Sequence, residues 1–125
     1  MQKRIYDLEE RLVEYACRMI DVVEALPSTR TGNHISAQLI RTCHSPAFNY
    51  EEAQGAESIK DFIHKMGTIV KELKECRVAL KIIRHKCILN PAARTDAIYS
   101  ETEQLIAIFA KSINTARRNL AHPDN

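Results

Sequence analysis

Residues 59–87 read IKDFIHKMGTIVKELKECRVALKIIRHKC, and this stretch decides the fold. Its apolar residues recur at alternating steps of three and four, and they are Ile59, Phe62, Met66, Ile69, Leu73, Cys76, Leu80, Ile83 and Cys87. This spacing puts them on one side of an α-helix. Ser58 with Asp61 resembles a capping pair, and Asn90-Pro91 ends the pattern. The sequence therefore predicts a long amphipathic helix over residues 57–89.

Three further segments show helical periodicity, at residues 5–26, 33–54 and 95–121. The first has an apolar seam that starts at Ile5 and stops before Pro27, which disfavours helix in the preceding residue. The second is interrupted by Ser45-Pro46, where we expect Ser45 to cap a new segment and Pro46 to occupy its first turn. Thr95 is the expected cap of the last helix, whose seam runs to Leu120.

Composition favours one helical domain covering residues 1–125. The chain has 125 residues, of which 45% are hydrophobic, enough for one core. It has only three Gly and four Pro, so the tight turns of β-sandwiches are poorly supplied. Four helices joined by short loops predict an all-α, antiparallel up-and-down four-helix bundle whose second helix is bent or split near Ser45-Pro46.

Other features predict where the chain resides. No apolar run approaches the ~20 residues that a membrane span needs, and the amino terminus does not resemble a signal peptide. We therefore expect a cytoplasmic protein that does not contact membranes. Four widely separated cysteines, Cys17, Cys43, Cys76 and Cys87, form no C-x-x-C pair and are expected to be reduced thiols.

The charge is concentrated in the long helix. Residues 56–90 hold eight Lys or Arg against four Asp or Glu, a local charge of +4, whereas the whole chain carries +2. Lys74, Arg77, Lys81 and Arg84 are spaced three, four and three, so they share one helix face, with Lys86 close by. Such a row of cations is suited to bind the phosphates of RNA or DNA. The alternative is an ordinary solvated face.

The polar residues do not predict a catalytic or metal site. Helical bundles that hold two metals use Glu-x-x-His on facing helices, and no histidine here lies three residues after a Glu. Cys43-His44 is the only adjacent Cys/His pair, and it lacks an evident third group to orient a base. Asp61 with Lys65, and Arg41 with an acid across the turn, look like ion pairs that set helix register. We expect no enzyme activity, cofactor, metal or small-molecule substrate.

Several polar positions in residues 26–76 together resemble a known family, the bacterial four-helix-bundle proteins encoded in 23S ribosomal RNA intervening sequences. The positions that carry the resemblance are Gln38, Arg41, Ser45, Asn49, Glu52, Ser58, Asp61, Lys65, Glu72 and Glu75, within runs such as Asn49-Tyr50-x-Glu52-Ala53 and Lys60-Asp61-Phe62. The chain departs from the family at Thr42-Cys43-His44 and at Phe48, where the family has smaller residues.

That resemblance implies an antiparallel four-helix bundle that assembles into a ring, a homopentamer, with no established activity. The resemblance also implies that the ten polar positions form a family-motif polar network. A relative with a similar fold, the accessory protein of diversity-generating retroelements, is thought to bind nucleic acid through a basic surface. Independently, Ile63 and Val70 lie to one side of the apolar seam of the long helix, where a second subunit would bury them.

Two hypotheses about function follow. The first is a non-catalytic homo-oligomer that binds RNA or other nucleic acid through Lys74, Arg77, Lys81, Arg84 and Lys86. The second is a structural or protein-interaction module, in which the same charges only keep the assembly soluble. Salt-sensitive retention of nucleic acid distinguishes them.

Overall fold

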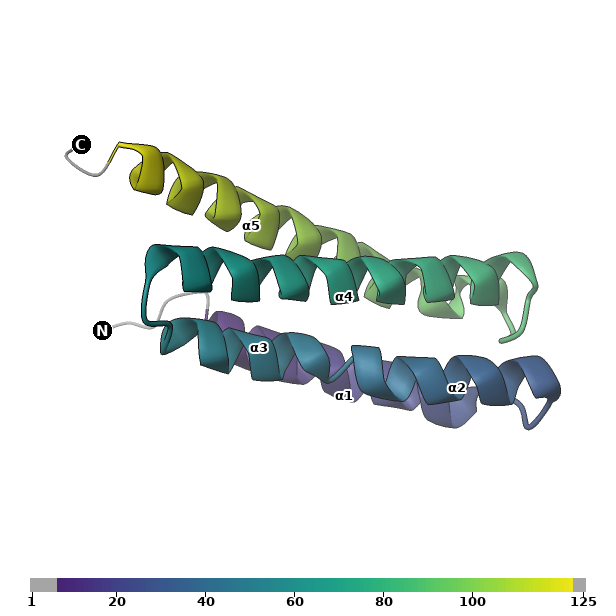
Figure 1. Cartoon of the computed structure of the whole chain (residues 1–125). Helices are drawn as coiled ribbons and strands as arrows, with labels where there is room; N and C mark the ends of the chain where they lie inside the picture. Colours follow the sequence, from purple (N-terminus) through teal and green to yellow (C-terminus); the bar gives the residue numbers. More distant parts are fainter. Residues whose placement is uncertain (1–6, 123–125) are drawn as a thin grey trace.

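The structure is a computed structural model that describes residues 7–122. It contains the helices α1 (Leu8–Ala25), α2 (Arg30–Thr42), α3 (Ser45–Gln54), α4 (Ile59–His85) and α5 (Asp96–Ala121), with a short 3-10 helix, η1 (Ala92–Thr95), before α5. Figure 1 shows that α2 and α3 together form one bent helical arm, and that the chain reverses direction after α1, after α3 and after α4. The prediction of an all-α, antiparallel four-helix bundle is confirmed.

The first helix begins at a side-chain cap. Asp7 accepts a hydrogen bond from the backbone N–H of Glu10 at 3.2 Å, and Glu9 and Glu10 in the first turn suit the positive end of the helix dipole. The helix ends at Ala25, one residue earlier than expected, before Leu26-Pro27. Ile5, the expected first member of the seam, lies outside the described residues.

The second helix begins earlier than the sequence indicated, at Arg30 rather than 33. The Thr29 hydroxyl accepts a hydrogen bond from the backbone N–H of Gly32 at 3.0 Å, so Thr29 is the N-cap and Gly32 lies inside the helix. Glycine is disfavoured in helix interiors, so its presence in the first turn of α2 needs a reason. A Cβ at Gly32 would lie 2.0 Å from the carbonyl oxygen of Pro27, so the close approach of the two segments requires glycine here.

The split in the second helical arm occurs where Pro46 predicts it. Proline has no backbone N–H to bond the carbonyl four residues earlier, which is that of Thr42, the last residue of α2. The cap is not Ser45, as expected, but His44, which makes no side-chain capping bond; Ser45 is the first helical residue. Both Cys43 and His44 keep helical backbone angles, so the arm bends at this point and continues in the same direction.

The α4 seam forms the centre of the core, as its spacing predicted. Six residues of this seam are buried, and they are Met66, Ile69, Leu73, Cys76, Leu80 and Ile83. The predicted ends are wrong: α4 stops at His85, and Cys87 has a φ of 51°, so the chain turns and Cys87 is exposed. At the other end Ile59 is 42% exposed. With 27 residues the helix is about 40 Å long.

The last helix packs along α4 and carries the second large part of the core. Leu105, Phe109 and Ile113 are buried, whereas Leu120, the expected end of the seam, is exposed. The Phe109 ring meets Tyr50 of α3 edge to face, with 5.7 Å between the ring centroids. Thr95 does not cap the helix through its side chain; its hydroxyl is buried and has no hydrogen-bond partner among the described residues.

The helices surround the core as the corners of a square. α4 packs against α3, α2 and α5, and α1 packs against α2, α3 and α5. In Figure 1, α4 and the α2–α3 arm lie in front, with α5 and α1 behind them. α1 and α4 therefore lie at diagonally opposite corners. Their outer sides face solvent on opposite sides of the molecule.

Candidate functional site

The four cations predicted to form one row on α4 divide into two kinds. Lys74 and Lys81 are exposed, and neither has an ion-pair partner within residues 7–122. Arg77 instead pairs with Glu103 of α5, with 3.7 Å between its Nη1 and Oε2 of the carboxylate. The arginine side of the row thus lies at the edge of the α4–α5 contact, where α5 partly neutralises it.

Arg84 is the most constrained member of the row. Its Nη2 lies 3.1 Å from a carboxylate oxygen of Asp96, and its guanidinium stacks over the Tyr99 ring at 4.6 Å from the centroid. Its Nε is buried without a hydrogen-bond partner in the described part of the chain. These contacts give Arg84 a structural role, in which it joins the end of α4 to the start of α5.

Lys86 lies beyond the last residue of α4, in the C-cap position, and is exposed. Because successive helical residues are turned by about 100°, a residue two positions after Arg84 points to a different side of α4. Lys86 therefore extends the cationic surface around the end of the helix and does not lengthen the row.

The ten family-motif positions do not form one connected network. Asn49 donates to the Ser45 hydroxyl at 2.9 Å and to the Ser45 carbonyl at 3.0 Å, all within α3. The Ser58 hydroxyl accepts from the backbone N–H of Asp61 at 3.0 Å, which confirms Ser58 as the cap of α4. Each of these bonds closes one local turn.

The predicted ion pairs of this region take other partners. Lys65 contacts Glu52 of α3 at 2.8 Å, so it joins two helices and does not form the predicted pair with Asp61 on its own helix. The reason is that α3 packs closely on the first half of α4. Arg41 donates to the carbonyl of Ala37 at 3.2 Å, within α2, in place of the predicted acid across the turn.

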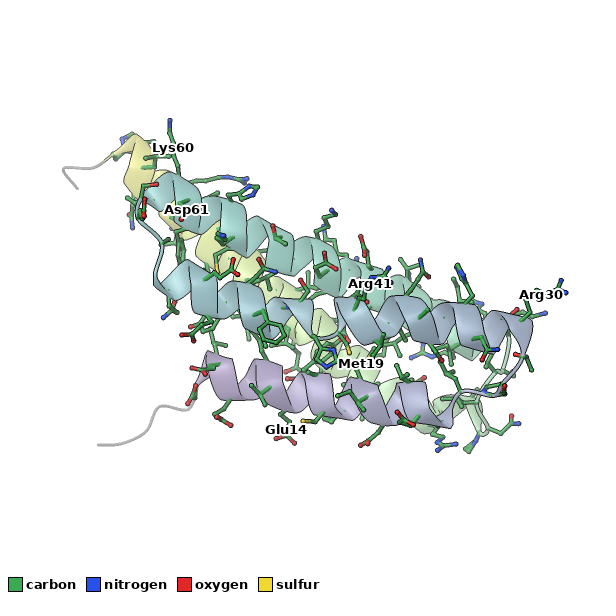
Figure 2. All side chains as sticks on the ribbon, turned by 60° about the horizontal axis from the view of Figure 1, so that its bottom comes forward. Glu14, Met19, Arg30, Arg41, Lys60 and Asp61 are labelled. Atoms are coloured by element: carbon green, nitrogen blue, oxygen red, sulfur yellow. The ribbon has the colours of Figure 1, made fainter. Side chains whose placement is uncertain are left out.

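Gln38, Arg41 and Glu75, three of the motif positions, line a groove between α2 and the part of α4 from Gly67 to Ile82. Its volume is about 750 Å³. The apolar part of its lining comes from Ile35 and Leu39 of α2 and from Val70, Val78, Ala79 and Ile82 of α4, and the cations Arg41, Lys71 and Lys74 stand around it. Figure 2 shows Arg41 on the side of α2 that faces α4. The sequence signal for this groove was the displaced Val70.

Glu72, another motif position, is partly buried beside this groove. Burial raises its pKa, and the neighbouring Glu75 raises it further, whereas Lys71 and Arg41 oppose the shift. The two nearby cations thus help to keep the carboxylate charged.

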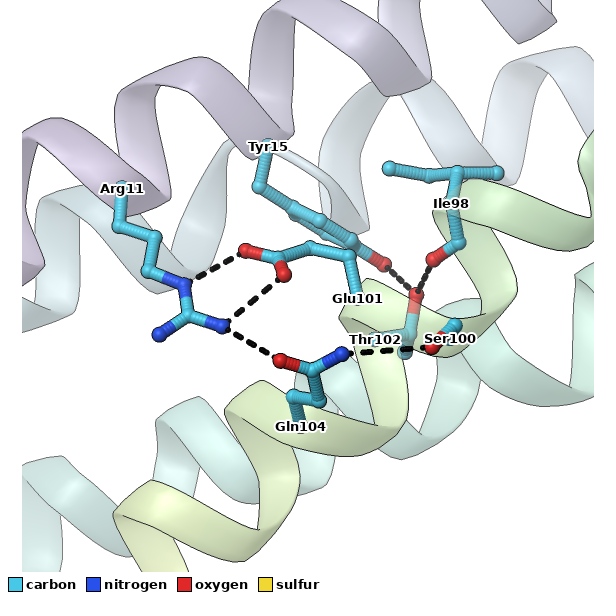
Figure 3. Close-up of polar contacts among 7 residues, drawn as sticks. All are labelled: Arg11, Tyr15, Ile98, Ser100, Glu101, Thr102 and Gln104. Carbon is cyan, nitrogen blue, oxygen red and sulfur yellow. Dashed lines mark hydrogen bonds and ion pairs between the residues drawn. The ribbon is translucent and has the colours of Figure 1, made fainter.

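Sequence reasoning missed a polar cluster that joins α1 to α5 (Figure 3). Arg11 donates to both carboxylate oxygens of Glu101, at 2.8 and 3.0 Å, and to the side chain of Gln104 at 3.1 Å. Beside it the buried Thr102 hydroxyl donates to the carbonyl of Ile98 at 2.7 Å, so the Tyr15 hydroxyl, also at 2.7 Å, must donate to Thr102. Tyr15 within the apolar seam of α1 was the available signal, because a buried tyrosine needs a partner for its hydroxyl.

The buried cysteines are poor nucleophiles. Burial raises the pKa of the Cys43 thiol to about 11, and burial also raises the pKa of Cys76. The thiolate is the reactive form, so neither sulfur is suited to attack a substrate at neutral pH. Cys17 and Cys87 are exposed.

These thiols predict a loss of stability at alkaline pH. Burial raises the pKa of Cys43 to about 11 in the folded protein, above its usual value of 9.0, so the thiol of the unfolded chain loses its proton first. The stabilising contribution is complete below pH 9 and is lost as the pH rises towards 11. Urea denaturation should show a smaller alkaline loss in Cys43→Ala than in Cys17→Ala, its exposed control. If the two variants lose the same stability at alkaline pH, ionisation of Cys43 is not the cause of that loss.

None of the helices within residues 7–122 is long and apolar enough to cross a membrane. In the same part of the chain no group of three or more His, Cys, Asp or Glu side chains is placed to hold a metal ion.

Comparison with known proteins supports the fold. No family model and no curated protein matches the sequence. A solved structure, that of a protein of unknown function from the S23 ribosomal protein family of Bacteroides thetaiotaomicron, superposes with a TM-score of 0.76 at 22% sequence identity. The similarity covers 85% of this chain and 94% of that one. The family resemblance seen in the sequence is therefore matched by the fold, and the neighbour is itself uncharacterised.

Proposed function

We propose that this chain is a non-catalytic module that assembles with copies of itself, as a homopentamer, and binds RNA or other nucleic acid through exposed lysines of α4. One observation carries the binding proposal: Lys74, Lys81 and Lys86 are exposed cations without an ion-pair partner in the described residues. Free cations release the counterions of a phosphate backbone when they bind it, whereas cations already paired with acids contribute less.

The arginines of the predicted row enter the proposal in a different role. Arg77 and Arg84 hold α4 against α5 and so present the lysines from a rigid helix. In the proposed oligomer the lysines would be repeated and would bind one strand more tightly, because linked weak sites bind more tightly than a single site does.

The test is binding to single-stranded RNA and duplex DNA, measured by fluorescence anisotropy at about 50 mM and about 200 mM salt. We expect the wild-type affinity to fall steeply between the two, and the variant Lys81→Ala, Lys86→Ala to lose about one unit of salt slope for each lysine. Arg84 is left intact because its removal would strand Asp96 and disturb the α4–α5 junction.

The matched control is Lys60→Ala, Lys111→Ala, which removes two exposed lysines elsewhere on the surface. It should bind as the wild type does. If both double variants lose affinity equally, binding follows net charge only, and if no protein binds at low salt, the lysines are a solvated face. Either result would overturn the nucleic-acid proposal.

The groove between α2 and α4 favours a second candidate function, a protein-interaction module. Val78 and Ile82 are 55% and 44% exposed there, although both belong to the most hydrophobic class of side chains. Exposed apolar side chains gathered in one groove are typical of a surface that another protein covers. This function predicts partner binding without retention of nucleic acid.

A further inference from the structure

The groove between α2 and α4 has an apolar floor and a cationic rim. Among its lining residues Arg41, Lys71 and Lys74 are cations and Glu75 is the one acid, which leaves two positive charges in excess. From Gly67 to Ile82 the α4 side of the groove spans about 23 Å at the rise of an α-helix. A ligand that fits it is therefore an elongated element with apolar and acidic side chains, such as one face of a helix.

This chain itself carries such a helix face, on the outer side of α1. Glu10, Glu14, Asp21 and Glu24 are all exposed, and with Cys17 they are spaced four, three, four and three, which places them in one row. Figure 2 shows Glu14 directed away from the bundle. Val13, 42% exposed, adds apolar surface beside the row. From Glu10 to Glu24 the row spans about 21 Å, close to the length of the groove.

The basic residues of α1 do not cancel this row. Arg11 is held by Glu101 and Gln104 of α5, on the inner side of the helix. Arg18 lies half-buried beside a small cavity against the start of α5, and Asp21 of the acidic row and Arg94 line the same cavity. The outer side of α1 is therefore acidic along its length, opposite in sign to the rim of the groove.

We infer that the groove between α2 and α4 binds the acidic outer face of α1 from a second copy of this chain, with Lys71 and Lys74 facing Glu14 and Asp21. In the assembly Lys74 then belongs to this contact, and Lys81 and Lys86 are the lysines of α4 that stay open to nucleic acid. The inference rests on the proposed self-association and names the two surfaces that produce it. Because α1 and α4 lie at diagonally opposite corners, each copy has both surfaces free at once. Two different surfaces that bind each other form a heterologous, head-to-tail contact, which closes into a ring when the rotation between copies permits.

Other occupants of the groove fit less well. The first six residues of this chain, MQKRIY, contain Lys3 and Arg4 and no acid, so this segment has the wrong charge for a cationic rim. A nucleic acid would meet the lysines but would leave Val78 and Ile82 in water. An acidic and apolar helix face satisfies both parts of the groove.

A charge-swap experiment on the full chain tests the inference. The mass in solution is measured by light scattering and sedimentation for a groove variant, Lys71→Glu with Lys74→Glu, and for an α1 variant, Glu14→Lys with Asp21→Lys. Each alone should weaken association at least tenfold, because like charges then face each other. The quadruple variant, in which both surfaces are reversed, should associate again, as should an equimolar mixture of the two double variants.

The control is Lys60→Glu with Lys111→Glu, which changes the net charge as much as the groove variant does but lies outside the groove. Far-UV circular dichroism establishes that each variant folds. The pairing of these two surfaces is overturned if both double variants still form oligomers as the wild type does, or if the quadruple variant stays dissociated. In either case the proposed self-association itself still stands. A wild-type chain that is monomeric at every concentration would overturn both. Nucleic-acid binding through Lys81 and Lys86 is measured by a separate experiment, so its failure can be distinguished from a failure of self-association.

Discussion

Phe109→Ala is expected to lower the free energy of unfolding by about 3–5 kcal/mol, the usual cost of emptying a buried aromatic site. The Phe109 side chain is fully buried in the middle of α5, and its edge-to-face contact with Tyr50 is one of the links between α5 and the α2–α3 arm. Removal of the ring therefore leaves a cavity between helices that neighbouring side chains only partly fill. Urea denaturation followed by far-UV circular dichroism measures the change.

Leu120→Ala is the matched control, because it shortens an apolar side chain near the end of the same helix. Leu120 is 39% exposed, so we expect a change within about 0.5 kcal/mol. If Phe109→Ala costs no more than Leu120→Ala, then α5 does not dock through Phe109 as described. The comparison separates loss of core packing from any general effect on the helix.

Gly32→Ala is expected to destabilise the protein by about 1–3 kcal/mol, the range seen when a packed site receives an extra methyl group. A Cβ at Gly32 would lie 2.0 Å from the carbonyl oxygen of Pro27, and a backbone atom cannot move aside as the end of a flexible side chain can. Relief requires a shift of the turn that joins α1 to α2, including the Thr29 cap. The clash outweighs the better helix propensity of alanine, which is worth about 1 kcal/mol.

Gly67→Ala makes the same substitution in a helix where no atom of the same chain opposes it. No atom lies within 4 Å of a Cβ built at Gly67. Alanine should therefore stabilise α4 by about 0.5–1 kcal/mol through helix propensity alone. Chemical denaturation of the two variants should give changes of opposite sign, and a shared sign would show that the turn before α2 is not packed as described.

Much of the candidate site could be predicted from the sequence, and the rest could not be predicted for one physical reason. Lys74, Arg77, Lys81 and Arg84 could be placed on one face of α4 because helical geometry relates residues three and four apart. Their division into free lysines and paired arginines depends on Glu103 and Asp96, which belong to another helix. Packing around the whole core decides which face of α5 contacts α4. The spacing of residues within α4 gives no information about that face.

The groove and the polar cluster between α1 and α5 have the same origin. Exposed Val78 and Ile82 look like ordinary seam neighbours in the sequence, and they line a groove because α2 makes less contact with α4 than α3 does after the bend. Arg11 and Glu101 are 90 positions apart, so only the meeting of two helices reveals their pairing.

Local spacing was sufficient to predict four amphipathic segments, the bend at Pro46 and the Ser58 cap, because helix periodicity, proline and capping act over a few residues. The ends of the helices, the cap at Thr29 and the partners of Lys65 and Arg84 were decided by the tertiary structure. These features depend on contacts between side chains from distant segments of the chain. Such contacts form only when the apolar faces of all the helices are buried together.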